Sequence, residues 1–188
     1  MSRIRDIHLK EEGYRRIHWA ERHTPILNRL ASRFEREQPF AGMNMAISLH
    51  LEAKSACLVR CLMRGGAQAY VTGSNPYSTN DAVCAALADE GAEVFAIHGA
   101  TMGETHEFWQ EVLKVKPDLV IDDGADLINL LLGEHQADAI HLIGACEETT
   151  SGVQRLHAWE REGRLTFPTI AINDARSKSW FDNFYGTG

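Results

Sequence analysis

The sequence predicts an α/β fold: a doubly wound, mostly parallel sheet between two layers of helices, with additional helices at the N-terminus. From residue 43 onward, short apolar runs alternate with amphipathic segments of helical period. The apolar runs begin about 21 to 30 residues apart, which is the spacing of strand–helix units. Repeated units of this length favour parallel pairing with right-handed crossovers, as in a three-layer Rossmann-like domain.

Two helices are expected before the sheet begins. Apolar residues recur near every 3.6 positions across residues 8–37. Thr24 is expected to cap the second helix, with Pro25 in its first turn, where the missing N–H of proline costs nothing. This helical part should end at Pro39 and Gly42.

Six strands and five further helices are expected after residue 43. The strands are short apolar runs at 45–49, 69–72, 93–97, 118–121, 139–143 and 169–172. The helices lie between them, near 52–64, 79–90, 103–116, 126–133 and 149–162. Thr79 is expected to cap the second of these helices, and glycines 65, 66, 91 and 163 stand where helices should end.

Composition is that of an ordinary soluble domain. The chain has 188 residues, of which 44% are hydrophobic and 24% charged, so we expect one domain over residues 1–188. Its net charge of −7 argues against a broad nucleic-acid or anionic-membrane surface. No apolar run reaches 18 residues and the N-terminus lacks the core of a signal peptide, so we expect a cytoplasmic protein without a membrane partner.

Metal and dinucleotide motifs are absent from the sequence. The four cysteines show no C-x-x-C spacing and lie in apolar patterns, which favours reduced, buried thiols. The histidines show no H-E-x-x-H spacing, so no metal site is predicted. Neither G-x-G-x-x-G nor a phosphate-binding P-loop occurs, so the chain has no self-contained dinucleotide fingerprint.

Polar side chains follow most of the expected strands. In an open parallel sheet, ligands bind beyond the carboxyl ends of the strands, so these side chains should gather in one crevice. Asp122 and Asp123 adjoin an apolar strand, where ionised carboxylates need partners, and Lys178 is the cation expected nearby. A lysine close to carboxylates in a partly dry cleft can be tuned for proton transfer.

Five motifs resemble the S-adenosyl-L-homocysteine hydrolase family, in that family's order and spacing. They are SLHLEAKS at 48–55, SNPYSTND at 74–81, IDDGADL at 121–127, EETTSGV at 147–153, and the Asn-Asp…Lys…Phe-Asp-Asn-Phe-Tyr-Gly pattern at 173–186. The resemblance covers nearly the whole chain. The H-L-E-A-K form is similar to the archaeal and thermophilic-bacterial branch.

The resemblance implies NAD-dependent cleavage of a thioether. NAD oxidises the ribose 3′-hydroxyl, a base removes the acidified 4′ proton, and homocysteine is eliminated. Water then adds and the ketone is reduced, so S-adenosyl-L-homocysteine gives adenosine and homocysteine. The cofactor carries the hydride chemistry, and the protein positions it.

The resemblance also implies catalytic roles for four residues. His50 corresponds to the proton-transfer histidine near the 5′ carbon, and Asp123 to the aspartate paired with it. Lys178 and Asp182 correspond to the lysine and aspartate at the 3′ and 2′ hydroxyls, with Lys178 as the base for the 3′ oxidation.

Binding residues follow from the same resemblance. Glu148 matches the residue that binds the ribose hydroxyls, Glu52 and Lys54 lie where the family recognises the purine, and Asn75 is a candidate for the pocket wall. The residues expected to touch NAD are Thr149, Thr150, Ser151 and Asn183. Because the purine position varies between branches, inosine in place of adenosine stays open.

The chain departs from the family pattern in several places. The stretch YGTG at 185–188 matches the point where family members enter their NAD domain, so that domain is expected to be missing here. Ser151 replaces a usual threonine, Asn80 a usual glutamine, and Ala125 a usual glycine. These changes allow a diverged paralogue.

Three functions are therefore compatible with the sequence. The first is the substrate-binding portion of an adenosylhomocysteinase-like enzyme. It would be either an excised fragment or one half of a split enzyme that a second chain with an NAD domain completes, and we expect a homo-oligomer. The second is a non-catalytic nucleoside-binding or regulatory module. The third is a stand-alone enzyme that cleaves nucleosides or thioethers without NAD, with His50 and Asp123 as acid and base.

Overall fold

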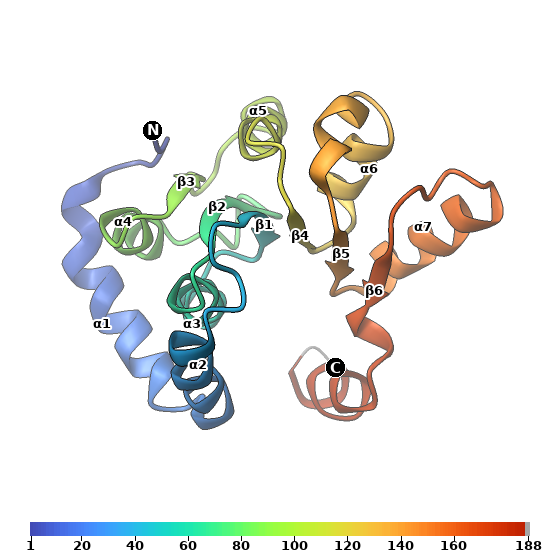
Figure 1. The fold of residues 1–188 in the computed structure, drawn as a ribbon. Helices are drawn as coiled ribbons and strands as arrows, with labels where there is room; N and C mark the ends of the chain where they lie inside the picture. The colour runs from blue at the N-terminus through green and yellow to red at the C-terminus, as the bar shows by residue number, and fades with distance from the viewer. Residues whose placement is uncertain (187–188) are drawn as a thin grey trace.

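A computed structural model of the chain describes residues 1–186. It contains a six-stranded sheet in the order β3-β2-β1-β4-β5-β6, with every neighbouring pair parallel (Figure 1). The order reverses between β1 and β4, which makes the fold doubly wound and confirms the predicted class.

The elements follow one another as alternating strands and helices after the N-terminal helices. The strands are β1 Asn44–Leu49, β2 Gln68–Gly73, β3 Glu93–Phe95, β4 Leu119–Asp122, β5 Gly144–Glu147 and β6 Thr169–Ala171. The α-helices are α1 Lys10–Glu21, α2 Pro25–Glu37, α3 Ala53–Arg64, α4 Asp81–Asp89, α5 Met102–Leu113, α6 Asp126–Leu132 and α7 Thr150–Arg161. Short 3-10 turns span Ile7–Leu9, Gln136–His141 and Ile172–Asp174, and a π-type helix spans Lys178–Gly186.

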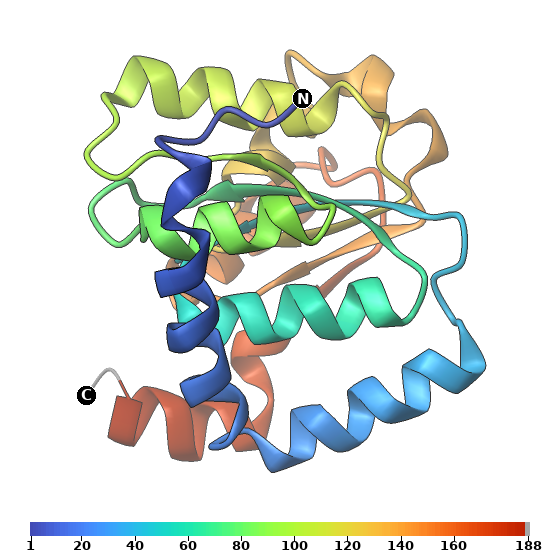
Figure 2. The same cartoon turned by 90° about the vertical axis from the view of Figure 1, so that its left-hand side faces the viewer.

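The two faces of the sheet form two separate cores. Along β1, Ile47 points to the core that contains α3 and α4, whereas its neighbour Ala46 points to the core that contains α5, α6 and α7. Helices α1 and α2 pack outside α3 and α4, as a further layer on the first face (Figure 2). A continuous apolar strand flanked by helices on both sides is the pattern expected of a central parallel strand.

The first face is less well covered over β4, β5 and β6. An apolar groove of about 320 Å³ lies there, and its lining includes Met45, Ile121, Ile143 and Ile170. Ile143 and Ile170 are 57% and 62% exposed, which is unusual for large aliphatic residues on a parallel sheet.

The fifth predicted strand was wrong. Residues 139–143 are apolar, but Gln136–His141 forms a 3-10 turn and Ile140 is 71% exposed. The true strand, β5, is made mostly of small residues, and it pairs with β4 and β6. A Cβ at Gly144 would lie 2.9 Å from the Pro168 carbonyl oxygen, so close strand packing replaces the usual β-branched signal.

One predicted cap was wrong, and the other is confirmed in position but makes no side-chain cap hydrogen bond. Asn80, not Thr79, caps α4: its side-chain oxygen accepts from the backbone N–H groups of Ala82 and Val83. Thr24 does stand at the start of α2, but its hydroxyl donates to carbonyls of α1 instead of accepting from α2. The predicted helix ends at Gly91 and Gly163 are confirmed by positive φ angles of 102° and 68°.

The C-terminal segment was not predicted as a helix. Lys178–Gly186 winds as a π-type helix beyond β6, and this is where several predicted site residues lie. The predicted YGTG motif extends past the described residues. In the described part of the chain, no helix is both long and apolar enough to cross a membrane.

Candidate functional site

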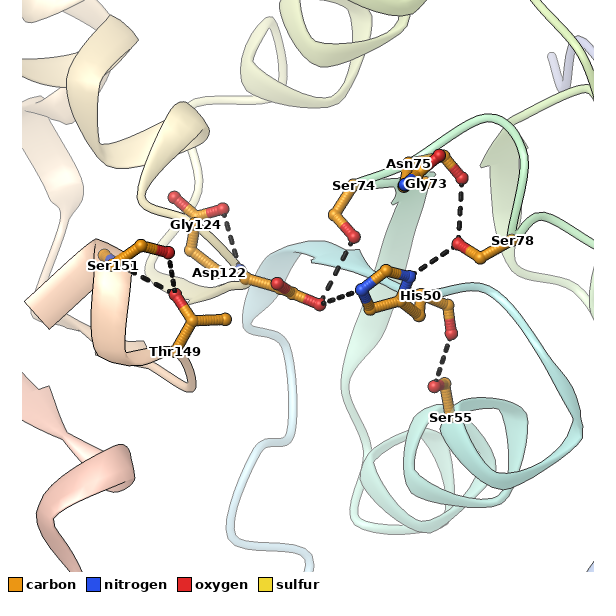
Figure 3. Close-up of polar contacts among 12 residues, drawn as sticks. His50, Ser55, Gly73, Ser74, Asn75, Ser78, Asp122, Gly124, Thr149 and Ser151 are labelled. Atoms are coloured by element: carbon orange, nitrogen blue, oxygen red, sulfur yellow. Dashed lines mark hydrogen bonds and ion pairs between the residues drawn. The ribbon is translucent and has the colours of Figure 1, made fainter. Parts of the chain in front are cut away.

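The site begins at the switch point of the sheet, where β1 and β4 end side by side. His50 follows β1 and Asp123 follows β4, and the imidazole Nε2 lies 3.5 Å from Asp123 Oδ2 (Figure 3). The His50 side chain is 51% exposed and the Asp123 side chain 10% exposed. The pair therefore places a titratable imidazole at the mouth of the crevice and its carboxylate partner in the wall.

Two serines that the sequence analysis did not select complete this pair. Ser74 Oγ donates to Asp123 Oδ2 at 3.3 Å, and Ser78 Oγ lies 2.5 Å from His50 Nδ1. Figure 3 shows both serines pointing toward the pair from the loop after β2. In the sequence, the polar motif at 74–81 pointed to this loop, but only Asn75 was chosen from it as a candidate site residue.

Glu148 brings a second carboxylate to the same edge, directly after β5. Its backbone N–H donates to the Asp122 carbonyl, which joins the ends of β4 and β5. Burial raises the pKa of the Glu148 carboxyl, and the negative charge of Asp123 raises this pKa further, while Lys178 opposes the shift. Glu148, Asp123 and Lys178 are therefore close enough to interact electrostatically.

Lys178 reaches this edge from the C-terminal helix. Its Nζ donates to Asn183 Oδ1 at 2.7 Å and lies 3.2 Å from Asp182 Oδ2. Its side chain is 16% exposed, so the ammonium is largely withdrawn from water. A cavity of about 380 Å³ is lined by Glu148, Lys178 and Asp182 together with apolar side chains of β4, β5 and α3.

The predicted partner of Lys178 requires a correction. We expected Lys178 to neutralise Asp122 and Asp123, but the structure pairs it with Asp182 and pairs Asp123 with His50. The C-terminal helix carries both Lys178 and Asp182 one turn apart, which places the carboxylate closer to the lysine than the strand-end acids are.

Two further acids lie beneath Asp123 and Glu148. Asp122 and Glu147 are fully buried and occupy paired positions on β4 and β5. Burial raises the pKa of Asp122 well above its usual value, and the charge of Glu147 contributes in the same direction. Asp122 accepts hydrogen bonds from the backbone N–H groups of Ile128 and Asp123, so it anchors the turn into α6.

The residues expected to contact the purine do not line this cavity. Glu52 and Lys54 lie just past β1, with Lys54 Nζ 3.7 Å from Glu52 Oε1. Glu52 instead lines a separate, open pocket of about 600 Å³ with residues of α1, Trp19 among them. Asn75 is exposed, and its side-chain oxygen accepts from the backbone N–H of Tyr77. Glu52 and Lys54 follow His50 by two and four residues, and Asn75 precedes Ser78, the partner of His50, by three; we refer to Glu52, Lys54 and Asn75 as the rim.

The residues expected to touch NAD gather at the start of α7. Thr149 caps α7 by accepting from the backbone N–H of Gly152, and Ser151 Oγ lies 3.3 Å from its hydroxyl. Thr150 Oγ1 and the Asn183 side-chain amide both donate to Asn173 Oδ1. Hydroxyl and amide groups of this kind suit the polar end of a dinucleotide.

The four cysteines are free thiols; Cys57, Cys61 and Cys84 are buried as predicted, whereas Cys146 is only partly buried. Burial raises the pKa of Cys84 to about 12, which disfavours its reactive thiolate form. Within residues 1–186, no three His, Cys, Asp or Glu side chains are arranged to hold a metal ion.

Comparison with known proteins places these residues in a family. The family model described as S-adenosyl-L-homocysteine hydrolase matches residues 1–143 and 133–184. The chain is 50% identical over all of its 188 residues to an S-inosyl-L-homocysteine hydrolase from Methanocaldococcus jannaschii, and this covers 45% of that protein. It is 50% identical over 177 residues to an adenosylhomocysteinase from Archaeoglobus fulgidus, covering 94% of this chain and 44% of that protein.

The chain thus spans about 45% of the length of such relatives. Relatives of equal identity carry two different names, so the comparison leaves open which nucleoside this chain binds. The two segments matched by the family model contain His50, Asp123, Glu148 and Lys178. The extent of that match, joined to the predicted motifs, shows that the chain belongs to the S-adenosyl-L-homocysteine hydrolase family.

Proposed function

We propose that this chain is the substrate-binding portion of an NAD-dependent hydrolase that cleaves a purine-nucleoside thioether of homocysteine. The observation that carries the proposal is the meeting of His50, Asp123, Glu148 and Lys178 at one edge of the sheet. Simple nucleoside binding needs hydrogen-bond donors and acceptors, but it has no need of a half-buried lysine beside two carboxylates.

The ribose is expected to bind in the cavity lined by Glu148, Lys178 and Asp182. The carboxylates of Glu148 and Asp182 accept hydrogen bonds from the 2′ and 3′ hydroxyls. Lys178 would accept the proton of the 3′ hydroxyl when a bound cofactor oxidises that carbon. The apolar walls around these groups keep water from the reacting carbon.

His50 and Asp123 are expected to serve the 5′ carbon. Protonated His50 gives its proton to the departing thiolate sulfur, and the neutral imidazole then accepts a proton from the water that adds. Asp123, 3.5 Å from Nε2, stabilises the charged form of the imidazole during this cycle. One residue pair thereby serves both groups exchanged at the 5′ carbon, the sulfur that leaves and the water oxygen that adds. The 4′ proton passes to a base during the elimination and returns to C4′ when water adds.

NAD, when bound, supplies reversible hydride transfer at the 3′ carbon. From this chain, Thr149, Thr150, Ser151 and Asn183 would contact it. The sequence has no glycine-rich pyrophosphate loop, so the rest of the cofactor needs polypeptide outside these residues or a second chain. A homo-oligomer and a cytoplasmic location belong to the same proposal.

The base is expected to lie at the rim, against Glu52 and Lys54. A carboxylate beside an ammonium offers one acceptor and one donor, 3.7 Å apart. Hypoxanthine matches this pair with N1–H and O6, and adenine matches it with N6–H and N1 in the opposite order. The pair therefore suits S-inosyl- as well as S-adenosyl-L-homocysteine.

Calorimetry with inosine and adenosine tests the binding half of the proposal. Turnover of both thioethers is then assayed with NAD, with and without a separately prepared NAD-binding segment of a longer relative. We expect nucleoside binding by the chain and thioether cleavage only when NAD and the second segment are present. Cleavage without NAD and without a second chain would contradict the proposal, and so would the absence of nucleoside binding.

A further inference from the structure

Glu147, the last residue of β5, accepts several hydrogen bonds, although the proposed function gives it no part in binding or chemistry. It is fully buried, and its Oε1 accepts from the Gly124 N–H at 3.0 Å and from the Thr149 N–H and hydroxyl at 2.8 and 2.7 Å. Its Oε2 accepts from the Ala125 N–H at 2.9 Å. Four donors converge on two oxygens, so both oxygens of the side chain act as hydrogen-bond acceptors.

These donors come from the two loops that carry the site acids. Gly124 and Ala125 directly follow Asp123, and Thr149 directly follows Glu148. The Glu147 carboxylate thus lies between the loop after β4 and the start of α7, and it is bonded to both. Asp123 and Glu148 each directly precede a residue whose N–H donates a hydrogen bond to Glu147.

The loop after β4 has a conformation that presents its backbone N–H groups to the Glu147 side chain. Gly124 and Ala125 have φ angles of 101° and 61°, so two successive residues adopt left-handed conformations. A left-handed conformation costs an alanine roughly 1 kcal/mol. Backbone N–H groups turned inward by such residues form a concave anion site, and here the Glu147 carboxylate fills it.

The helix that follows Glu147 packs closely against its carboxyl group. A Cβ at Gly152, in the first turn of α7, would lie 2.2 Å from the carboxyl carbon and from Oε1. Only a glycine at this position admits the carboxylate. Arg155, one turn later, donates to the Gly124 carbonyl at 2.5 Å, which ties the same loop to α7 from a second point.

We propose that Glu147 is a positioning residue that sets the separation between Asp123 and Glu148. It holds the two loops at a fixed spacing, and it acts on the chemistry only through the two acids that flank its bonds. This inference rests on the proposed function, because Asp123 and Glu148 matter to catalysis only if that function is right.

The test is Glu147→Gln in the full chain, with Glu160→Gln on the exposed part of α7 as the matched control. The variant keeps the shape of the side chain. Whichever way the amide is turned, however, its NH₂ group faces at least one backbone N–H that now has no acceptor. Circular dichroism and thermal unfolding report whether the chain still folds.

Three readouts separate positioning from simple packing. Hydrogen exchange should accelerate at least tenfold at the Gly124 and Ala125 amides, while the Ile128 amide, bonded to Asp122, stays as in the parent. Carboxyl ¹³C titration should show the pKa of Glu148 falling toward its usual value, because Asp123 moves away. Inosine affinity should fall about tenfold, and Glu160→Gln should change none of these.

Unchanged exchange at Gly124 and Ala125, or acceleration spread evenly over the sheet, would overturn the inference. If the Glu147→Gln protein fails to fold, Thr149→Val and Thr149→Ser replace it. Thr149→Val removes one of the four donors to Glu147. It should accelerate exchange at Gly124 and Ala125 and lower the pKa of Glu148, but by less than Glu147→Gln would. Thr149→Ser keeps the hydroxyl and should restore the parent values. If the parent itself binds no nucleoside, the proposed function fails, but exchange and titration still decide the role of Glu147.

Discussion

The two walls of the crevice are held in place to very different degrees. On the β4 and β5 side, Asp122 and Glu147 are fully buried and bonded to backbone N–H groups on both sides of the reactive acids. On the β1 and β2 side, the side chains of His50 and Lys54 are 51% and 74% exposed. The wall formed by the ends of β4 and β5 is therefore preorganised by the buried Asp122 and Glu147. The rim that would meet the base is open to water.

Like charges explain much of this asymmetry. Asp122, Asp123, Glu147 and Glu148 stand at the ends of two adjacent strands, and the charge of one raises the pKa of another. Acids this close would push the loops apart unless donors held them, and backbone amides provide those donors to Asp122 and Glu147. The rim has no comparable repulsion, since Glu52 there has Lys54 as its neighbour.

The largest effect on activity is expected from Asp123→Asn, measured with NAD and an NAD-binding segment present. Asparagine keeps the shape but cannot stabilise a protonated His50, so turnover should fall by about 10²- to 10⁴-fold. Nucleoside affinity, measured by calorimetry, should change little. Asp126→Asn is the control, because that carboxylate pairs with Arg155 and not with His50. Equal turnover in the two variants would mean that the anchored wall has no special part in the chemistry.

Gly152→Ala tests the anchored wall through stability. The added Cβ would stand 2.2 Å from the Glu147 carboxyl carbon, and overpacking of this kind costs about 1–3 kcal/mol. Gly103→Ala, in α5, is the matched control: its nearest neighbour is 4.0 Å away, so alanine should stabilise the helix by up to about 1 kcal/mol. Urea unfolding of both variants gives the two values. A Gly152→Ala protein as stable as the parent would show that Glu147 is free to move.

Asp122 makes the stability of this wall depend on pH. Because burial raises its pKa in the folded state, its contribution is fully present below the unfolded pKa of about 3.9 and is lost as pH rises through the higher folded pKa. Each pKa unit between the two states corresponds to about 1.4 kcal/mol. Relative to Asp122→Asn, the parent should therefore lose unfolding free energy as pH rises from the unfolded pKa toward the higher folded pKa. Parallel pH curves for the two proteins would refute this.

The same contrast separates what the sequence could predict from what it could not. Strand ends are local patterns, and the fold collects them, so His50 and Asp123 were found together at the switch point. The strand of small residues at Gly144–Glu147 was missed because its packing depends on a close approach of the segment before β6. Glu147 was missed for a related reason: its partners are mainly backbone N–H groups, which carry no sequence signal. The one related feature in the sequence is Gly152, because only a glycine there leaves space for the Glu147 carboxyl group.

The smallest effect is expected at the open rim, from Lys54→Met. In the proposed pairing, Lys54 donates to O6 of inosine or to N1 of adenosine, and Glu52 accepts from N1–H of inosine or from the amino group of adenosine, so Lys54→Met removes one hydrogen bond from each base. Because Lys54 is 74% exposed, water competes for the contact, so the loss should be only about threefold, and similar for the two nucleosides. Glu52→Gln is the companion variant, and it should also weaken both. Calorimetry of both nucleosides with both variants decides the matter: unchanged affinities would place the base elsewhere, in a site that the anchored wall alone defines.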